Sequence, residues 1–179
     1  MKKWVIDPDH SVAAFVIKHM MITNVRGQFN KISGAIQLDT DDISRSFVEV
    51  SIDAAGIYTG IQKRDDHLRS ADFFNVERYP NIIFKSKAVT VEGAERNHFK
   101  ITGELFVHGI SKAVILNAAH FGPEKSPFGG EITMGFTATT SINRENYGLM
   151  WNEILESGGI MVGKEVQIML DIEADLVTE

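Results

Sequence analysis

The stretch EVQIMLDIEADLV, residues 165–177, alternates between apolar and polar side chains. Its aliphatic residues fall on every second position, and the residues between them are mainly charged or amide side chains: Val166, Ile168, Leu170 and Ile172 against Glu165, Gln167, Asp171 and Glu173. Successive side chains of a β-strand point to opposite faces, so this pattern predicts a strand with one apolar face and one solvated face.

Seven further segments have strand length and similar alternation: residues 10–19, 32–38, 46–53, 82–91, 99–107, 112–120 and 132–142. They recur at near-regular spacing and are separated by turn signals such as Glu92-Gly93 and Gly129-Gly130. This spacing is typical of antiparallel all-β folds. We therefore predict a closed eight-stranded antiparallel β-barrel, whose interior holds either packed side chains or one ligand. Small residues at inward positions favour the second outcome, because they leave volume along the axis: Ala13, Gly34, Gly103, Ala118 and Ala138.

Composition limits the classes of function. The chain has 179 residues without a linker or repeat, which predicts one domain covering residues 1–179. A formal net charge of −6 disfavours nucleic acid as a partner. The chain has no cysteine, which excludes disulfides and thiolate chemistry. It also has no glycine-rich phosphate loop, and we expect no cofactor.

The N-terminal segment begins with two lysines, but no apolar stretch of signal-peptide length follows them. No run of about 20 apolar residues occurs elsewhere in the sequence. The sequence therefore predicts no membrane span and a cytoplasmic location.

Two segments interrupt the alternation. Thr59-Gly60-Ile61-Gln62 matches a capping box and predicts a helix that runs to Arg69, with Ser70 capping a second short turn. In residues 147–163, the apolar positions 150, 151, 154 and 155 have helical spacing and predict a short flap. We expect these short helices to cover one mouth of the barrel.

The residues resemble the YceI-like family of bacterial polyisoprenoid-binding proteins along nearly the whole chain. The matching residues occur in order, as Trp4 to Asp7, His10-Ser11, Phe15, Lys18-His19, Val25 to Phe29, Gly34, Arg64 to Leu68, Asp72 to Phe74, Tyr79-Pro80, Phe84, Ser86, Gly103 to Leu105, Gly109, Lys112 and Arg144 to Gly148. The resemblance implies an extended lipocalin-like barrel that holds a long isoprenoid chain, such as a quinone-precursor tail or a polyprenyl lipid. It also implies possible homodimers. Many family members carry a signal peptide, and we expect none here because no apolar stretch of suitable length follows the first lysines; Tyr147 stands where the family motif commonly has Phe.

Residues 64–67, Arg-Asp-Asp-His, form the densest polar cluster. Adjacent helix positions point about 100° apart, so Asp65, Asp66 and His67 cannot converge on one substrate atom. We expect this cluster mainly to anchor the helix, with contact to a ligand head group and catalysis as alternatives. The six histidines show no metal-ligand spacing, and we expect no metal site.

Arg144 follows the inward positions 140 and 142, and a charge near an apolar interior needs a partner. We expect that partner to be Asp65, Asp66 or Glu153, with a ligand head group as the alternative.

The sequence thus favours a non-enzymatic carrier or store for a long-chain isoprenoid lipid. The residues predicted to contact the ligand are Phe15, Ile17, His19, Phe29, Val50, Leu68, Phe73, Phe74, Phe84, Leu105, Phe136, Ile142, Arg144, Met150, Trp151 and Leu170. Among these, Phe73, Phe74, Met150 and Trp151 are expected to close the mouth. The alternative is an enzyme that acts on a lipid head group, with His67 or His19 as base and Arg144 as anion holder.

Overall fold

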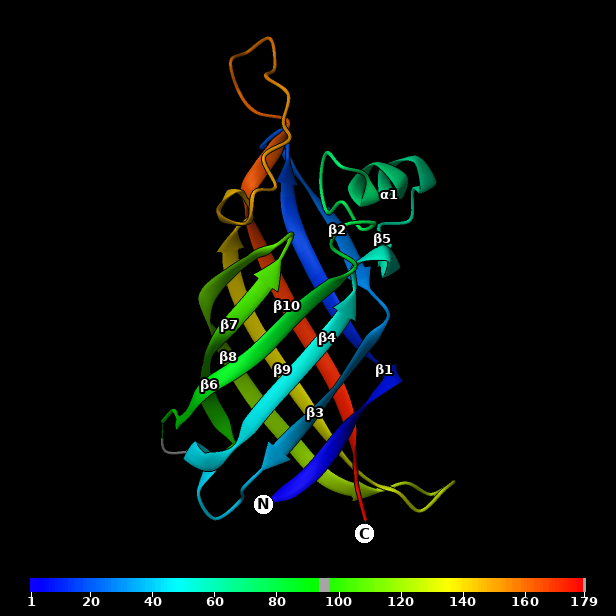
Figure 1. The fold of residues 1–179 in the computed structure, drawn as a ribbon, viewed down its shortest axis with the longest axis vertical. Coiled ribbons are helices and arrows are strands. Elements are labelled where there is room, and N and C mark those ends of the chain that lie inside the picture. Colours follow the sequence, from blue (N-terminus) through cyan, green and yellow to red (C-terminus); the bar gives the residue numbers. More distant parts are fainter. Residues whose placement is uncertain (94–96, 179) are drawn as a thin grey trace.

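The computed structural model describes residues 1–93 and 97–178 and is dominated by antiparallel strands (Figure 1). The described elements follow in the order β1 (Lys2–His19), β2 (Thr23–Phe29), β3 (Ile32–Leu38), η1 (Ile43–Arg45), β4 (Phe47–Asp53), η2 (Ala54–Gly56), β5 (Ile57–Tyr58), α1 (Gln62–Arg69), β6 (Asn81–Val91), β7 (His98–Val107), β8 (Ile110–Lys125), β9 (Ile132–Asn143), η3 (Arg144–Tyr147) and β10 (Val162–Leu176). None of the helices in the described ranges is long and apolar enough to cross a membrane.

Eight of the strands close into a barrel, which confirms the predicted fold. Neighbouring strands pair in the order β1-β10-β9-β8-β7-β6-β4-β3, and β3 returns to β1. Every pairing in this ring is antiparallel. Closure leaves no unpaired edge in the ring, which removes the templates for aggregation that open sheets present.

The long strand β1 organises one side of the barrel. Its first residues, from Lys2 to Val5, pair with β3, and its last residues, from Ala13 to His19, pair with β2. Strand β2 in turn pairs with the two-residue strand β5. The β2–β5 extension thus lengthens the wall at the end of the barrel where α1 lies (Figure 1).

The structure corrects several predicted boundaries. The first strand begins at Lys2 instead of residue 10, and the strand Thr23–Phe29 was not predicted. The helix Gln62–Arg69 is present, but the capping box is wrong, because the side chain that reaches back to Thr59 belongs to Asp65. The flap predicted in residues 147–163 is not helical beyond η3. It is an extended loop closed by a bridge between Ile154 and Ile160.

The two termini lie at the same end of the barrel (Figure 1). There the buried side chains of Trp4, Ile36, Leu38, Met134 and Ala174 form one apolar cluster. A larger cluster lies toward α1 and includes Phe29, Ile57 and Tyr147, among others. Members of both clusters line a cavity in the interior.

Candidate functional site: an apolar cavity along the barrel axis

The barrel contains a cavity of about 410 Å³, and its walls are almost entirely apolar. Inward positions of the strands supply the lining, as the alternation requires: on β10, for example, Val166, Ile168, Leu170 and Ile172 all line it. The volume lies in the range of roughly 300–1,000 Å³ that is common for small-molecule sites. A chamber of this kind favours an apolar ligand.

The structure places fifteen of the sixteen predicted ligand-contacting residues on the cavity wall: all except Met150. Phe15 and Leu105 are only half-buried although they point inward, because the cavity itself is accessible beside them. Met150 is 59% exposed and does not line the cavity, which corrects its predicted role in closing the mouth. Its neighbours Leu149 and Trp151 are turned inward instead.

Several lining residues were not predicted. They include Val25, Ile43, Phe47, Val89, Phe99, Ile101, Val114, Leu116 and Met161. Alternation could have found Val114 and Leu116, which share a face of β8 with Ala118. Ile43 and Met161 lie outside the strands, where period-two reasoning gives no signal.

Small residues shape the cavity at only some of the predicted positions. Ala13, Ala118 and Ala138 line it. Gly103 is small for another reason: a Cβ atom there would lie 2.5 Å from both the ring of Phe84 and the carbonyl oxygen of Lys85. A Cβ at Gly34 would collide with the backbone of Glu49. The expectation that these two glycines leave free volume along the axis is therefore wrong.

An aromatic cluster covers the end of the cavity beside α1. The rings of His67, Phe73 and Trp151 contact one another, with centroid separations of 5.1 Å, 4.7 Å and 5.3 Å for the pairs His67–Phe73, His67–Trp151 and Phe73–Trp151. The Nε2 atom of His67 lies 2.8 Å from a carboxylate oxygen of Asp72. The imidazole is thus oriented by Asp72 while its ring forms part of the cavity wall.

The polar residues of α1 have separate partners. Asp65 is buried and accepts hydrogen bonds from the backbone N–H of Thr59 at 2.9 Å and from its hydroxyl at 2.5 Å. Arg69 donates to the carbonyl oxygens of Ala55 and Ile57 at 2.9 and 2.8 Å. Asp66 accepts hydrogen bonds from side chains of the same helix instead. These contacts fix α1 to β5 and η2, and they do not bring the carboxylates together on one substrate atom.

Arg144 is 97% buried, and its guanidinium donates hydrogen bonds to backbone carbonyls of the loop that follows η3 and of the first residues of β10. The acceptors are the carbonyl oxygens of Gly163 at 2.7 Å, Leu149 at 2.5 Å, Trp151 at 3.0 Å and Val162 at 3.2 Å. Burial lowers the pKa of Arg144 from its ordinary value. Among the described residues no ion pair joins Arg144 to Asp65, Asp66 or Glu153, so the predicted carboxylate partner is wrong. Arg144 instead clamps the loop over the cavity.

Among the described residues, basic and imidazole side chains border the cavity only at the end beside α1. Lys18, His19, Arg64, His67 and Arg144 are in the lining, and in the described part of the chain no Asp or Glu is. The wall can therefore accommodate a neutral or anionic group at this end, but it opposes a cationic one.

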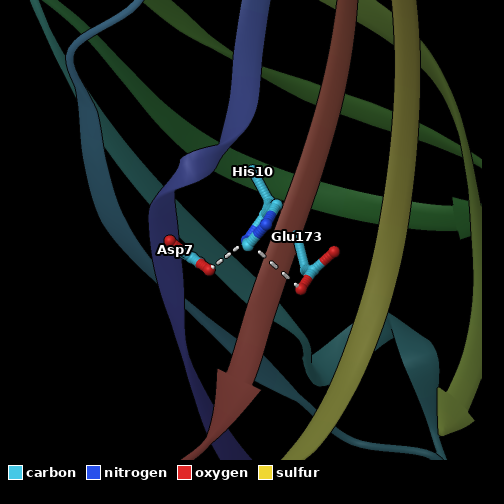
Figure 2. Close-up of side chains that lie close together, drawn as sticks. All are labelled: Asp7, His10 and Glu173. Carbon is cyan, nitrogen blue, oxygen red and sulfur yellow. Dashed lines mark hydrogen bonds and ion pairs between the residues drawn. The ribbon is translucent and has the colours of Figure 1, made fainter. Parts of the chain in front are cut away.

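A separate polar cluster lies on the outer wall, where Figure 2 shows His10 between Asp7 and Glu173. The Nδ1 atom of His10 lies 2.7 Å from Asp7 and 3.8 Å from Glu173. The hydrogen bond lowers the pKa of Asp7 and raises that of His10. One imidazole and two carboxylates form a possible donor set for a divalent metal ion.

Two observations favour an ion pair at this cluster over a metal site. His10 is largely exposed, and it is already paired with Asp7. Ser11 bridges the same bulge of β1 to β10 through the backbone of Glu173. The ion pair thus accounts for the local structure without a metal ion.

The fold and the hollow apolar interior define a lipocalin-like antiparallel barrel. Residues 4–174 match the model of the YceI-like domain, and the chain belongs to the YceI-like family. The chain is 35% identical over 173 residues to the UPF0312 protein SA2479 of Staphylococcus aureus strain N315, with 97% of each chain covered.

Solved structures share the fold. BcnA of Burkholderia cenocepacia superposes with a TM-score of 0.80 at 23% identity, covering 94% of this chain and 98% of BcnA. The Campylobacter jejuni YCEI protein gives a TM-score of 0.73 at 28% identity, covering 90% of both chains. A structure described as a polyisoprenoid binding domain from Saccharophagus degradans gives 0.71 at 15% identity, covering 99% and 100%.

Proposed function

We propose that this protein binds a long-chain polyisoprenoid or isoprenoid-quinone lipid in its barrel and acts as a carrier or store, not as an enzyme. The observation that carries the proposal is the axial cavity, whose wall is apolar along its length and has its basic and imidazole residues at one end. The structural likeness to the Saccharophagus degradans domain, which its description calls polyisoprenoid binding, gives independent support for the ligand class.

The apolar lining favours long tails over short ones. Burying hydrocarbon contributes about 0.8 kcal/mol per methylene, whereas association costs on the order of 4–15 kcal/mol. A five-carbon isoprenoid cannot offset that cost through its tail. A tail of about 20 carbons contributes roughly 16 kcal/mol on the same scale, enough for tight binding without an ionic anchor.

The contacts of Arg144 do not favour the enzymatic alternative. That alternative needs the guanidinium to hold an anion, but its Nε, Nη1 and Nη2 atoms donate to backbone carbonyls. His67 is oriented by Asp72 and packed against Trp151, which suits a wall residue. We propose that His19 and His67 contact the polar end of the ligand and catalyse no reaction.

Organic extraction and native mass spectrometry of protein purified from bacteria test the proposal directly. We expect a co-purified prenyl lipid, and we expect the stripped protein to gain thermal stability with ubiquinone-10 but not with the tail-less ring, ubiquinone-0. The absence of any lipid, together with no gain in stability from either quinone, would contradict the proposal. A cytoplasmic location and a homodimer are further proposals, tested by cell fractionation and by light scattering.

A further inference from the structure

The turn between β1 and β2 carries exposed apolar side chains on a strained backbone. Met20 and Met21 have φ values of 52° and 61°, and the N–H of Ile22 donates to the carbonyl of His19 at 3.1 Å. Two consecutive left-handed residues define the type of hairpin turn that favours Asn-Gly. Here the positions hold methionines that are 38% and 56% exposed, and the adjacent Ile22 is 79% exposed. Folding alone does not account for long apolar side chains at these positions.

A second apolar tip lies beside this turn. In the loop of residues 148–161, Ile154 is 83% exposed and Met150 is 59% exposed. The backbone N–H of Met20 donates to the carbonyl of Met161 at 2.6 Å, which ties the turn to the loop. Both project from the same end of the barrel, away from the termini (Figure 1). We call these five residues, Met20, Met21, Ile22, Met150 and Ile154, the apolar rim.

The apolar rim is continuous with the cavity wall. His19 and Met161 line the cavity, and they lie directly beside Met20 in the chain and in its hydrogen bonding. The cavity also extends toward the opposite end, where Ile36 and Leu38 of the cluster around Trp4 line it. A lipid tail that leaves the cavity past Met161 thus meets the apolar side chains of the rim.

Charge on the β1–β2 hairpin complements lipid phosphates. The chain has 24 acidic residues, but none between His10 and Leu38, where Lys18 and Arg26 are both exposed. Strands rise about 3.3 Å per residue, which places these cations at roughly phosphate depth when the turn enters the acyl region. Glu153 and Glu156 in the second loop oppose the attraction. We therefore expect the β1–β2 turn to insert deepest.

We propose that the apolar rim docks on an anionic lipid bilayer and opens the cavity toward it, so that the ligand passes between membrane and barrel without crossing water. This inference rests on the proposed function, since it assumes a lipid cargo. We favour a bilayer over a protein partner because the apolar rim consists of Met and Ile side chains on two narrow turns. The centres of protein interfaces are instead enriched in Tyr, Trp and Arg.

Co-flotation with vesicles made of equal parts phosphatidylcholine and phosphatidylglycerol tests the docking. The variant Met20→Asn/Met21→Gly/Ile22→Thr removes the apolar tip and gives the turn its favoured sequence, so it should fold at least as well as the parent chain. We expect its vesicle affinity to fall about tenfold or more. The matched control is Phe128→Ser, which removes a fully exposed apolar residue from the β8–β9 turn at the opposite end and should leave binding unchanged.

The ligand is measured separately, by native mass spectrometry with ubiquinone-10 delivered in detergent. The triple variant should still load the quinone from detergent, but it should take it up more slowly from vesicles. If the parent chain fails to float with vesicles, or if Phe128→Ser weakens flotation as much as the triple variant does, the docking proposal is wrong. The function proposal fails separately if no quinone binds in detergent.

Discussion

Replacing Ala138 with Phe tests whether the cavity holds a lipid tail at the middle of the barrel. Ala138 on β9 pairs with Ala118 on β8 and with Leu170 on β10, and all three residues line the cavity. The two adjacent alanines leave a recess in the wall. A phenyl ring at position 138 would project into this recess and toward the axis.

The size of the effect follows from the hydrocarbon that the ring displaces. Phe has about six more carbon atoms than Ala, and at about 0.8 kcal/mol per methylene the tail loses roughly 5 kcal/mol of transfer free energy. This corresponds to a loss of more than roughly a thousandfold in affinity. In a filled core the same change would cost about 1–3 kcal/mol of folding stability. In a hollow one, we expect the free energy of unfolding of the empty protein to stay the same or rise.

Fluorescence of Trp151, which lines the cavity, can report ubiquinone-10 binding in detergent, and urea unfolding gives the stability. The matched control is Thr139→Phe, which adds an aromatic ring at the next position of the same strand but on the exposed face. We expect Thr139→Phe to leave affinity unchanged. If Ala138→Phe is markedly destabilised and still binds the quinone, the interior is packed at this point and the tail lies elsewhere.

Three other substitutions have directions that the structure sets. Gly103→Ala should lower the free energy of unfolding, measured with urea, by about 1–3 kcal/mol. The ring of Phe84 and the carbonyl oxygen of Lys85 occupy the space of the new methyl group. An unchanged stability would mean that these neighbours move aside freely. Arg144→Met should lower the free energy of unfolding by about 3 kcal/mol or more, because several buried carbonyls lose their hydrogen-bond donor. Limited proteolysis should then cut the loop of residues 148–161. If the loop stays intact, Arg144 does not hold it in place. Burial lowers the pKa of His120 below its ordinary 6.5, so the unfolded chain binds more protons and stability should fall as the pH drops through about 6.5. His120→Phe should flatten that part of the pH profile and keep the stacking on Phe99, and an unchanged profile would count against this origin.

The barrel was predictable because one face of each strand meets an apolar interior and the other meets solvent. Apolar residues therefore recur at every second position of the sequence. The strand Thr23–Phe29 was missed because Gly27 occupies an inward position, where a larger residue would collide with the ring of Phe15. The helical flap predicted in the loop after η3 was wrong for a different reason. Its apolar residues have helical spacing, but the turn around Gly158 and the bridge between Ile154 and Ile160 fold it into an extended hairpin.

The sequence likewise predicts some residues of the site and not others. Wall residues such as Phe15 and Leu170 follow from alternation. The role of Arg144 does not follow from the sequence, because its acceptors are backbone carbonyls in residues 149–163. Every residue type has such a carbonyl, so the sequence does not identify the acceptors. The close contact of Gly103 with Phe84 is equally hidden, since a small inward residue can mark either free volume or a neighbour that already fills it. Only the three-dimensional register separates the two cases.

A hollow barrel must obtain its stability from its wall and its ends. Lining residues such as Phe15, Val50 and Leu105 keep part of their surface unpacked beside the cavity, so they give less to folding than a filled core would. The strands are held by the closed hydrogen-bonded ring, which forms without the ligand. By contrast, α1 and the loop of residues 148–161 lie outside this ring, and their side chains His67 and Trp151 contact the cavity directly. A bound tail should therefore stabilise α1 and the loop of residues 148–161 more than the strands, and hydrogen exchange should show protection concentrated in those two segments.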